Sequence, residues 1–132
     1  MSDRTLATTD LLESLALSGT ANVTIPVPQN TQNLTIAVSA QYAAVAATSG
    51  IQAAFSTSVD GTTFVAATEK DLVLTPAATV LGQGKVTFRL GNDPYRLDEP
   101  SYLNSIKVTL TNLDATNAAV VTVGHEAANF SL

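Results

Sequence analysis

His125 is the only histidine in this chain of 132 residues, and its imidazole is the side chain best suited to act as a general base near neutral pH. Such a base needs a nucleophile to activate and an acid to orient it. The sequence contains no Cys, no Gly-x-Ser-x-Gly motif and no Ser-His-Asp pattern around His125. If His125 belongs to the same regular strand as Val121 and Val123, its imidazole faces inward with them. One bulge between them would turn it outward. We favour a structural or surface histidine and do not expect an enzyme.

Three carboxylates, Asp93, Asp98 and Glu99, lie in the polar connection of residues 91–102. Clustered carboxylate oxygens are ligands for Ca²⁺, so a metal site is one interpretation of this loop. The spacing matches no EF-hand loop, and Arg96 supplies a counter-ion from within the cluster. Asp and Asn also favour turns because their side chains hydrogen-bond to nearby backbone. We expect a solvated loop, or one that contacts a neighbouring subunit, and no metal or other cofactor.

Aromatic, phosphate-binding and glycosidase patterns give weak signals. Tyr95 and Tyr102 flank the same loop and offer a small patch for a sugar or peptide, but the chain has no Trp. Their expected role is to pin the loop to the edge of the domain, with buried rings and hydrated hydroxyls. The run Gly82-Gln83-Gly84-Lys85 lacks the spacing of a P-loop. Residues 82–84 are expected to form a turn, and Lys85 is expected to begin the strand that follows. The acids cluster in turns and near the N-terminus, which disfavours a carboxylate pair across a cleft.

The elements that would position these residues are strands. Within residues 50–65, four side chains are predicted to share one face: Ala53, Phe55, Thr57 and Val59. Asp60-Gly61 then provides the positive φ angles of a tight hairpin. No acid, base or aromatic platform is paired with this turn in the sequence, so its predicted role is to set the register of two strands.

The same alternation recurs along most of the chain and predicts about eight strands. Turn signals separate them at intervals of roughly 8–15 residues, and no helical stripe lies between them. This spacing favours a single all-β domain, an antiparallel β-sandwich of which the jelly roll is one form. The apolar positions of the other predicted strands are Val23, Ile25, Val27, Leu34, Ile36, Val38, Ala40, Leu72, Leu74, Val86, Phe88, Leu90, Ile106, Val108, Leu110, Val121 and Val123.

Residues 1–14 are predicted to form an N-terminal arm, and residues 15–132 the sandwich domain. The arm is polar and loose at first and then carries leucines. A short helical turn over Thr9–Ser14 is an alternative for its second half. We expect the arm to lie on a partner surface and to become ordered there. Pro26 and Pro28 lack N–H donors, so their segment is expected at the edge of a sheet.

Composition disfavours several classes of partner. The net charge is −5, and the six Lys and Arg residues are scattered along the chain, so no basic patch for nucleic acid or for an anionic membrane is expected. No run approaches the roughly 20 apolar residues of a membrane helix. The absence of Cys fits assembly in a reducing cytoplasm. The outward positions of the strands carry Thr, Ser, Ala and Gln more than Lys and Glu, which favours burial against other copies.

Three segments resemble small β-sandwich modules of tailed-phage structural proteins. The segment Phe55-Ser-Thr-Ser-Val-Asp-Gly-Thr-Thr-Phe-Val65 resembles a hairpin of the form sxDGtxF. Two later segments, Gly84-Lys-Val-Thr-Phe88 and Ile106-Lys-Val-Thr-Leu-Thr-Asn112, are similar to the strands that follow this hairpin. Together with the acidic composition and the lack of Cys, they make the chain similar to phage head decoration (cement) proteins.

The resemblance implies a non-enzymatic virion subunit that is assembled in the host cytoplasm and added to the surface of an expanded capsid, often as a homotrimer. Its implied partner is the major capsid protein, and its implied action is to bridge capsomers and so stabilise the shell. Two alternatives stay open: another virion component (tail, fibre or minor capsid protein), and a β-sandwich module that binds carbohydrate or a cell surface. The matching motifs are structural positions, so no catalytic, cofactor-binding or metal-binding residue is carried over.

Overall fold

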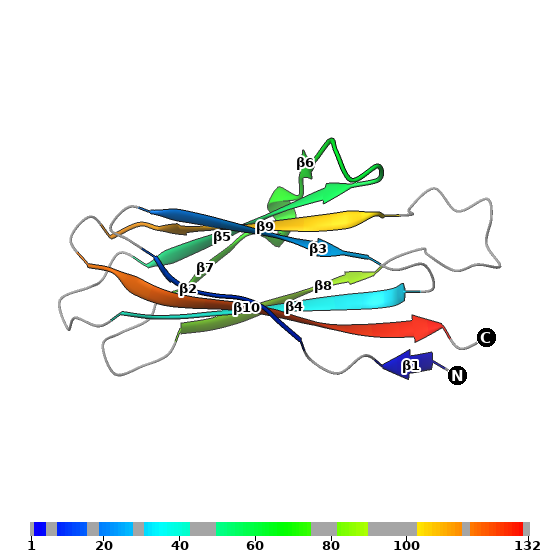
Figure 1. The fold of residues 1–132 in the computed structure, drawn as a ribbon, viewed down its shortest axis with the longest axis horizontal. Helices are drawn as coiled ribbons and strands as arrows, with labels where there is room; N and C mark the ends of the chain where they lie inside the picture. Colours follow the sequence, from blue (N-terminus) through cyan, green and yellow to red (C-terminus); the bar gives the residue numbers. More distant parts are fainter. Residues whose placement is uncertain are drawn as a thin grey trace.

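Two antiparallel sheets packed face to face form the fold (Figure 1). The computed structural model describes residues 2–4, 8–15, 19–27, 31–42, 50–74, 82–89, 103–114 and 117–130. Within these ranges every regular element is a β-strand except a single 3-10 turn, η1, at Thr68–Lys70. The prediction of an all-β antiparallel sandwich is therefore confirmed. The described part of the chain has no helix with the length and hydropathy needed to cross a membrane.

Sheet A contains five strands, two of which form a long central pair. The pair is β4, Thr31–Tyr42, and β10, Ala119–Phe130, which run antiparallel. β8, Gly82–Arg89, pairs with the free side of β4. β1, Ser2–Arg4, and β2, Thr8–Leu15, both pair with the free side of β10. Sheet A therefore has β8 at one edge and β1 with β2 at the other.

Sheet B is built around β9, Ser105–Asn112. β3, Thr20–Pro26, and β5, Ile51–Ser58, pair antiparallel with its two sides. Two short strands, β6 at Val65–Ala66 and β7 at Leu72–Leu74, pair with the free side of β5. Pro26 ends β3 at an edge of this sheet, as its missing N–H donor predicted.

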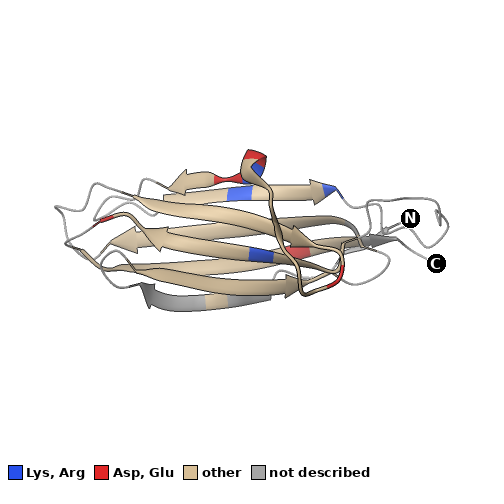
Figure 2. Cartoon of the chain, turned by 90° about the horizontal axis from the view of Figure 1, so that it is seen from above, with Lys and Arg blue, Asp and Glu red and all other residues tan. Residues whose placement is uncertain are grey.

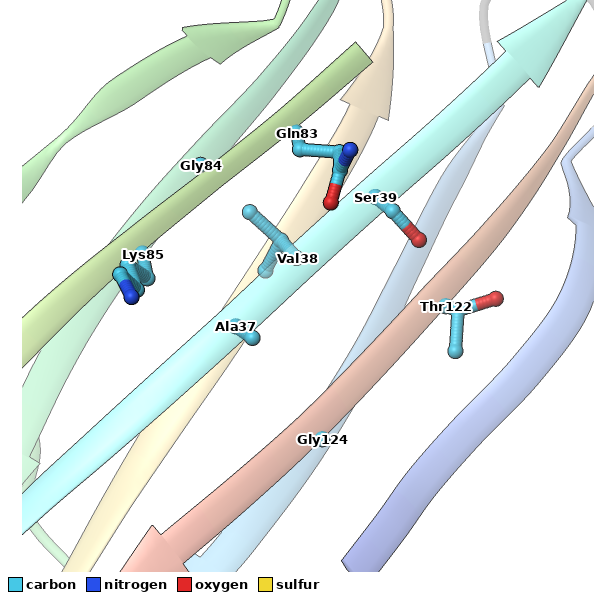
Figure 3. Close-up of a pocket in the computed structure, with 8 residues that line it drawn as sticks. All are labelled: Ala37, Val38, Ser39, Gln83, Gly84, Lys85, Thr122 and Gly124. Carbon is cyan, nitrogen blue, oxygen red and sulfur yellow. The ribbon is translucent and has the colours of Figure 1, made fainter. Parts of the chain in front are cut away.

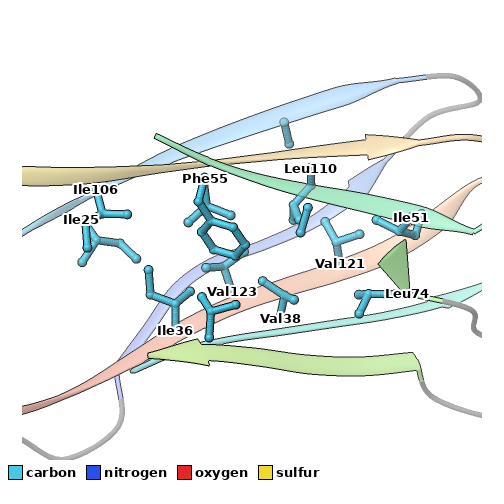
Figure 4. Packing of buried hydrophobic residues seen from close by; sticks show 14 of the residues in the cluster. Ile25, Ile36, Val38, Ile51, Phe55, Leu74, Ile106, Leu110, Val121 and Val123 are labelled. Carbon is cyan, nitrogen blue, oxygen red and sulfur yellow. The ribbon is translucent and has the colours of Figure 1, made fainter. Parts of the chain in front are cut away.

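Apolar side chains from both sheets fill the space between the layers (Figure 4). Because side chains alternate along a strand, every second position of the long strands faces this core. The Phe55 ring from sheet B lies across from the Phe88 ring of sheet A, with centroids 6.0 Å apart. The predicted alternation is confirmed at these buried positions: Ile25, Val27, Leu34, Ile36, Val38, Ala40, Ala53, Phe55, Leu74, Val86, Phe88, Ile106, Val108, Leu110, Val121 and Val123.

The second half of the predicted N-terminal arm is a strand, so the helical turn over Thr9–Ser14 is wrong. β2 pairs with β10 from Leu15 opposite Ala119 to Thr8 opposite His125. This pairing gives the backbone hydrogen-bonding partners that a single isolated helical turn would leave unsatisfied. The first residues of the arm also pair, with Ser2 opposite Phe130. Residues 1–14 therefore contribute β1 and most of β2 to sheet A.

The predicted turn at residues 82–84 is also wrong, because these residues begin β8. Gly82 pairs with Ala40 and Gly84 with Val38, so β4 supplies a continuous partner for this segment. Glycine at position 84 has a packing reason. A Cβ there would lie 3.0 Å from Leu72 Cδ1, so the missing side chain lets β8 approach β7 closely.

The tight hairpin predicted at Asp60-Gly61 is a longer loop. β5 ends at Ser58 and β6 begins at Val65, so residues 59–64 connect them. The alternation of β5 stops with the strand: Ser58 is buried, and Val59, predicted to face the core, is 65% exposed. Gly61 does have the predicted positive φ, at 81°. A turn is thus present at the expected residues, but it does not close a two-residue hairpin.

Candidate interaction surfaces

Of the candidate catalytic and metal-binding residues named in the sequence analysis, His125 is the one that the structure describes. His125 lies on β10 opposite Ile36, half-buried and in phase with Val121 and Val123. Among the described residues, no three His, Asp or Glu side chains lie close enough to hold a metal ion. The loop residues Asp93, Asp98, Glu99, Tyr95 and Tyr102 lie outside the described residues.

Asp60 organises the loop between β5 and β6. Its Oδ1 atom accepts hydrogen bonds from the Thr63 and Thr62 N–H groups, at 2.9 and 2.8 Å, and from the Ser58 hydroxyl at 2.9 Å. The Ser58 hydroxyl oxygen in turn accepts a bond from the Gly61 N–H at 2.8 Å. These donors, the Thr63 N–H foremost, favour the ionised carboxylate and hold the pKa of Asp60 below its ordinary value. The carboxylate is therefore engaged in fixing the loop.

A buried polar cluster joins the two sheets at one end of the sandwich. The Tyr42 hydroxyl of β4 lies 2.8 Å from the Gly50 carbonyl oxygen and 3.0 Å from Asn112 Oδ1. Asn112 Oδ1 also accepts the Asp114 N–H at 3.0 Å, and Asn112 Nδ2 donates to the Asn117 carbonyl at 2.8 Å. Burial, and next the nearby Asp114 carboxylate, raise the pKa of Tyr42, although the bond to Gly50 opposes them. Such a satisfied network fixes the relative position of the sheets.

Tyr42→Phe is expected to lower the free energy of unfolding by about 1–1.5 kcal/mol near neutral pH, because it removes one buried hydroxyl while both acceptors keep another donor. The raised pKa makes the difference depend on pH. Unfolded Tyr42 ionises near its ordinary pKa of 10.0, whereas the folded form keeps its proton to higher pH. This contribution to stability is complete below pH 10 and is lost as the pH rises through the folded pKa. Urea unfolding of both proteins at several pH values should show their difference shrinking above pH 10.

Sequence reasoning missed this cluster because its members look like turn residues. Asn112 and Asp114 belong to a polar stretch, 112–117, which is predicted as a turn from composition alone. The signal that could have identified Asn112 is its phase, since it continues the buried face of Leu110 along β9. A polar residue in a buried phase requires a hydrogen-bonding partner.

A shallow hollow of about 620 Å³ lies on the outer face of sheet A (Figure 3). Ala37 and Gly124, which pair across β4 and β10, contribute its smallest residues. Polar groups surround them: Ser39, Gln83, Lys85 and Thr122. A second hollow of about 420 Å³ lies farther along the same three strands and is lined by Asn33, Thr35, Thr87, Arg89, Glu126 and Ala128. None of the described residues that line the two hollows is aromatic.

The outer face of sheet B carries small polar side chains with very little charge. Thr109 Oγ1 of β9 donates to Asn22 Oδ1 of β3 at 2.7 Å. Lys107 is the one charged residue in this array, and its Nζ lies 4.9 Å from the centre of the Phe64 ring. Figure 2 shows how few charged positions the strands carry. The outward positions of the three longer strands of this sheet are Thr20, Asn22, Thr24, Lys107, Thr109, Thr111, Gln52, Ala54 and Ser56.

The outer faces of the two sheets differ in how much charge an interface would have to bury. Burying hydroxyl, amide and methyl groups costs less free energy than burying ions, provided that the polar groups find hydrogen-bonding partners, so the outer face of sheet B has the lower desolvation cost. The outer face of sheet A has shallow hollows lined by several charged residues.

No protein-family model and no curated protein match this chain. Solved structures do match its fold. The CBM22-1 xylan-binding domain from Paenibacillus barcinonensis Xyn10C aligns with a TM-score of 0.59 at 7% identity, covering 99% of this chain and 87% of that chain. A chain of Broad Bean Stain Virus aligns with a TM-score of 0.54 at 10% identity, covering 97% and 92%.

A third similar structure is the infectious bursal disease virus VP2 subviral particle, with a TM-score of 0.54 and 11% identity. The alignment covers 97% of this chain but 32% of the VP2 chain, so the present chain spans about a third of that protein. Identities this low show a common fold and nothing finer. The chain has a β-sandwich fold that is also found in carbohydrate-binding modules and in viral capsid proteins.

Proposed function

We propose that this chain is a non-enzymatic structural protein of a tailed-phage virion that decorates and stabilises the capsid, with the major capsid protein as its partner. The observation that carries the proposal is the nearly uncharged outer face of sheet B, from Asn22 and Thr109 to Ala54. A face of this kind can be buried over its whole width against a shell. The β-sandwich fold, which capsid proteins also use, and the resemblance to phage modules support the same role.

The proposed contact surface is the outer face of sheet B because it presents fewer charges than that of sheet A. Lys85, Arg89 and Glu126 line the hollows of sheet A and would have to be desolvated or paired in an interface. Among the outward positions of β3, β5 and β9 on the opposite face, Lys107 is the single charged residue, and its Nζ lies toward the Phe64 ring. A decoration protein bound in this way would add stability to the assembled shell by mass action.

The test uses heads purified before and after expansion from the phage that encodes the chain. The protein should bind the expanded heads, leave the unexpanded heads bare and raise the melting temperature of the expanded shell. Ala54→Arg places a charge in the centre of the proposed contact and should weaken binding by at least about tenfold. Ala37→Arg, which places the same charge on the exposed face of sheet A, is the matched control and should bind like the natural protein.

Failure of the natural protein to bind expanded heads would overturn the decoration role. Recovery of the chain from purified tails or fibres would then assign it to another part of the virion. If Ala37→Arg, and not Ala54→Arg, prevented binding, the capsid would contact sheet A instead. Melting curves of both variants without capsids check that each remains folded.

A carbohydrate-binding role is the second candidate, and the hollow on sheet A is the observation that favours it. Ser39, Gln83 and Thr122 provide hydroxyl and amide groups that could hydrogen-bond to a sugar. The hollow offers no aromatic ring for a sugar to stack on, which makes this role the weaker one. Binding to a glycan array that is lost in Gln83→Ala, with no binding to capsids, would favour the carbohydrate role over decoration.

A further inference from the structure

The two edges of sheet A have sequences of opposite charge. The longer strand at one edge is β2 and the strand at the other is β8; each contains eight residues, and no described strand pairs with the outer side of either. The sequence of β2 includes Asp10 and Glu13 and no Lys or Arg, whereas that of β8 includes Lys85 and Arg89 and no acid. β1, at the same edge as β2, adds Asp3 and Arg4, whose charges cancel, so the sequence of that edge is acidic and the sequence of the β8 edge is basic.

A third basic side chain reaches the β8 edge from η1. Lys70 Nζ donates a hydrogen bond to the Thr87 carbonyl oxygen at 3.0 Å and lies 5.4 Å from the centre of the Phe88 ring. The Thr87 carbonyl is therefore directed away from β4, toward the free side of β8. An N–H of an added strand would donate to the same carbonyl, beside or in place of Lys70. Both Lys85 and Arg89 are exposed, and neither forms an ion pair with another described residue.

Among the described residues, a hollow lies beside β8. It has a volume of about 520 Å³, lies along the edge of the strand and is bounded on the other side by β6 and η1. Its lining includes Ala66, Ala67 and Phe88, with Glu69 as the acid and Lys70 and Arg89 as the bases. Side chains of an added strand that face the sandwich interior would enter this hollow.

The strand directions are also compatible. β2 runs antiparallel to β10, β10 to β4, and β4 to β8, so β2 and β8 point in opposite directions. A second copy placed alongside in the same orientation therefore presents its β2 antiparallel to β8 of the first. An antiparallel ladder supplies partners for both free edges and needs no change in either strand.

We propose that β2 of one copy adds to β8 of the next, so that sheet A continues from copy to copy. Pairing of two β8 edges with each other would instead bring Lys85 and Arg89 of both copies together, and their repulsion opposes that arrangement. A contact between two different edges forms a ring if the rotation between copies closes and a filament if it does not. The homotrimer implied by the phage resemblance would be a ring of three. This self-association does not depend on the proposed virion role.

Charge reversal tests the proposal on the full chain. Lys85→Glu with Arg89→Glu makes both edges acidic, and Asp10→Lys with Glu13→Lys makes both edges basic. Each double variant should associate at least about tenfold more weakly than the natural protein, measured as mass against concentration by light scattering and sedimentation. The variant with all four changes should regain association, and a mixture of the two double variants should form mixed assemblies. Lys107→Glu, on the outer face of sheet B, is the control and should associate normally.

Three results would overturn the proposal. The natural protein could be monomeric at every concentration, or the fourfold variant could be folded and still fail to associate. Stronger association of the Lys85→Glu, Arg89→Glu variant would show that these charges protect a free edge from aggregation, as Lys does on many edge strands. Melting curves of every variant separate loss of association from loss of folding, and none of these measurements involves capsids.

Discussion

Phe55→Ala is expected to lower the free energy of unfolding by about 3–5 kcal/mol, the largest effect we predict for a single substitution. The side chain is 1% exposed and contacts the core of both sheets from the middle of β5. Removing the ring creates a cavity. It also removes the tilted contact with the Phe88 ring, whose plane lies at 59° to that of Phe55. Two β-sheets held by continuous ladders cannot collapse fully into that cavity. The free energy of unfolding is measured by urea titration, with circular dichroism as the signal.

Phe55→Leu is the matched variant, because it keeps most of the apolar volume and should cost less than about 2 kcal/mol. The slope of unfolding free energy against urea concentration should stay unchanged in both variants if the native state keeps its fold. A loss below about 1 kcal/mol for Phe55→Ala would contradict the central packing position of this ring.

Gly50→Ala is expected to cost about 3 kcal/mol, and the reason lies in the backbone. Gly50 has a φ of 91°, and a Cβ at this position would lie 2.6 Å from the Leu74 carbonyl oxygen. The backbone cannot move freely to relieve the overlap. The Gly50 carbonyl accepts hydrogen bonds from the Tyr42 hydroxyl and from the Leu113 N–H, so a shift would weaken the buried cluster between the sheets.

Gly84→Ala separates this effect from ordinary crowding. A Cβ at position 84 would also be close to its neighbours, at 3.0 and 3.2 Å, but these neighbours are the terminal methyl groups of Leu72 and Leu74. Side-chain ends can move, so we expect a loss of about 1 kcal/mol or less. Thermal unfolding of the two variants side by side makes the comparison. Equal losses would show that the positive φ and the contact with backbone at Gly50 are unimportant.

The strands and the core were predictable because a two-residue period is a local property of the sequence. Val121 and Val123, for example, require only that alternate side chains face the same side. The prediction of a turn at residues 82–84 failed because a local preference was overridden by a distant partner. Glycines favour turns locally, and here the long β4 strand provides a partner that overrides the preference. The strand at Thr8–Leu15 likewise depends on β10, more than 100 residues away in the sequence.

The grouping of charged residues on the surface could be predicted even less well than the strands, because it depends on the order of the strands in each sheet. Lys70, Lys85 and Arg89 look scattered in the sequence, and only the order of the strands brings them to one edge. The Asp60 loop was partly predictable, since an Asp-Gly pair favours a turn, but its length depended on where β5 stops. The proposed decoration role rests on the nearly uncharged outer face of sheet B together with the resemblance, and this face is defined only when β3, β9 and β5 lie side by side.

The position of β10 has a consequence for biosynthesis. It is the last strand that the structure describes and lies between β4 on one side and β1 with β2 on the other. β1 and β2 are synthesised more than 100 residues before this partner, so they cannot pair with it until β10 has emerged from the ribosome. Sheet A therefore closes late in synthesis, and any contact between copies that uses the complete sheet has to follow the appearance of β10.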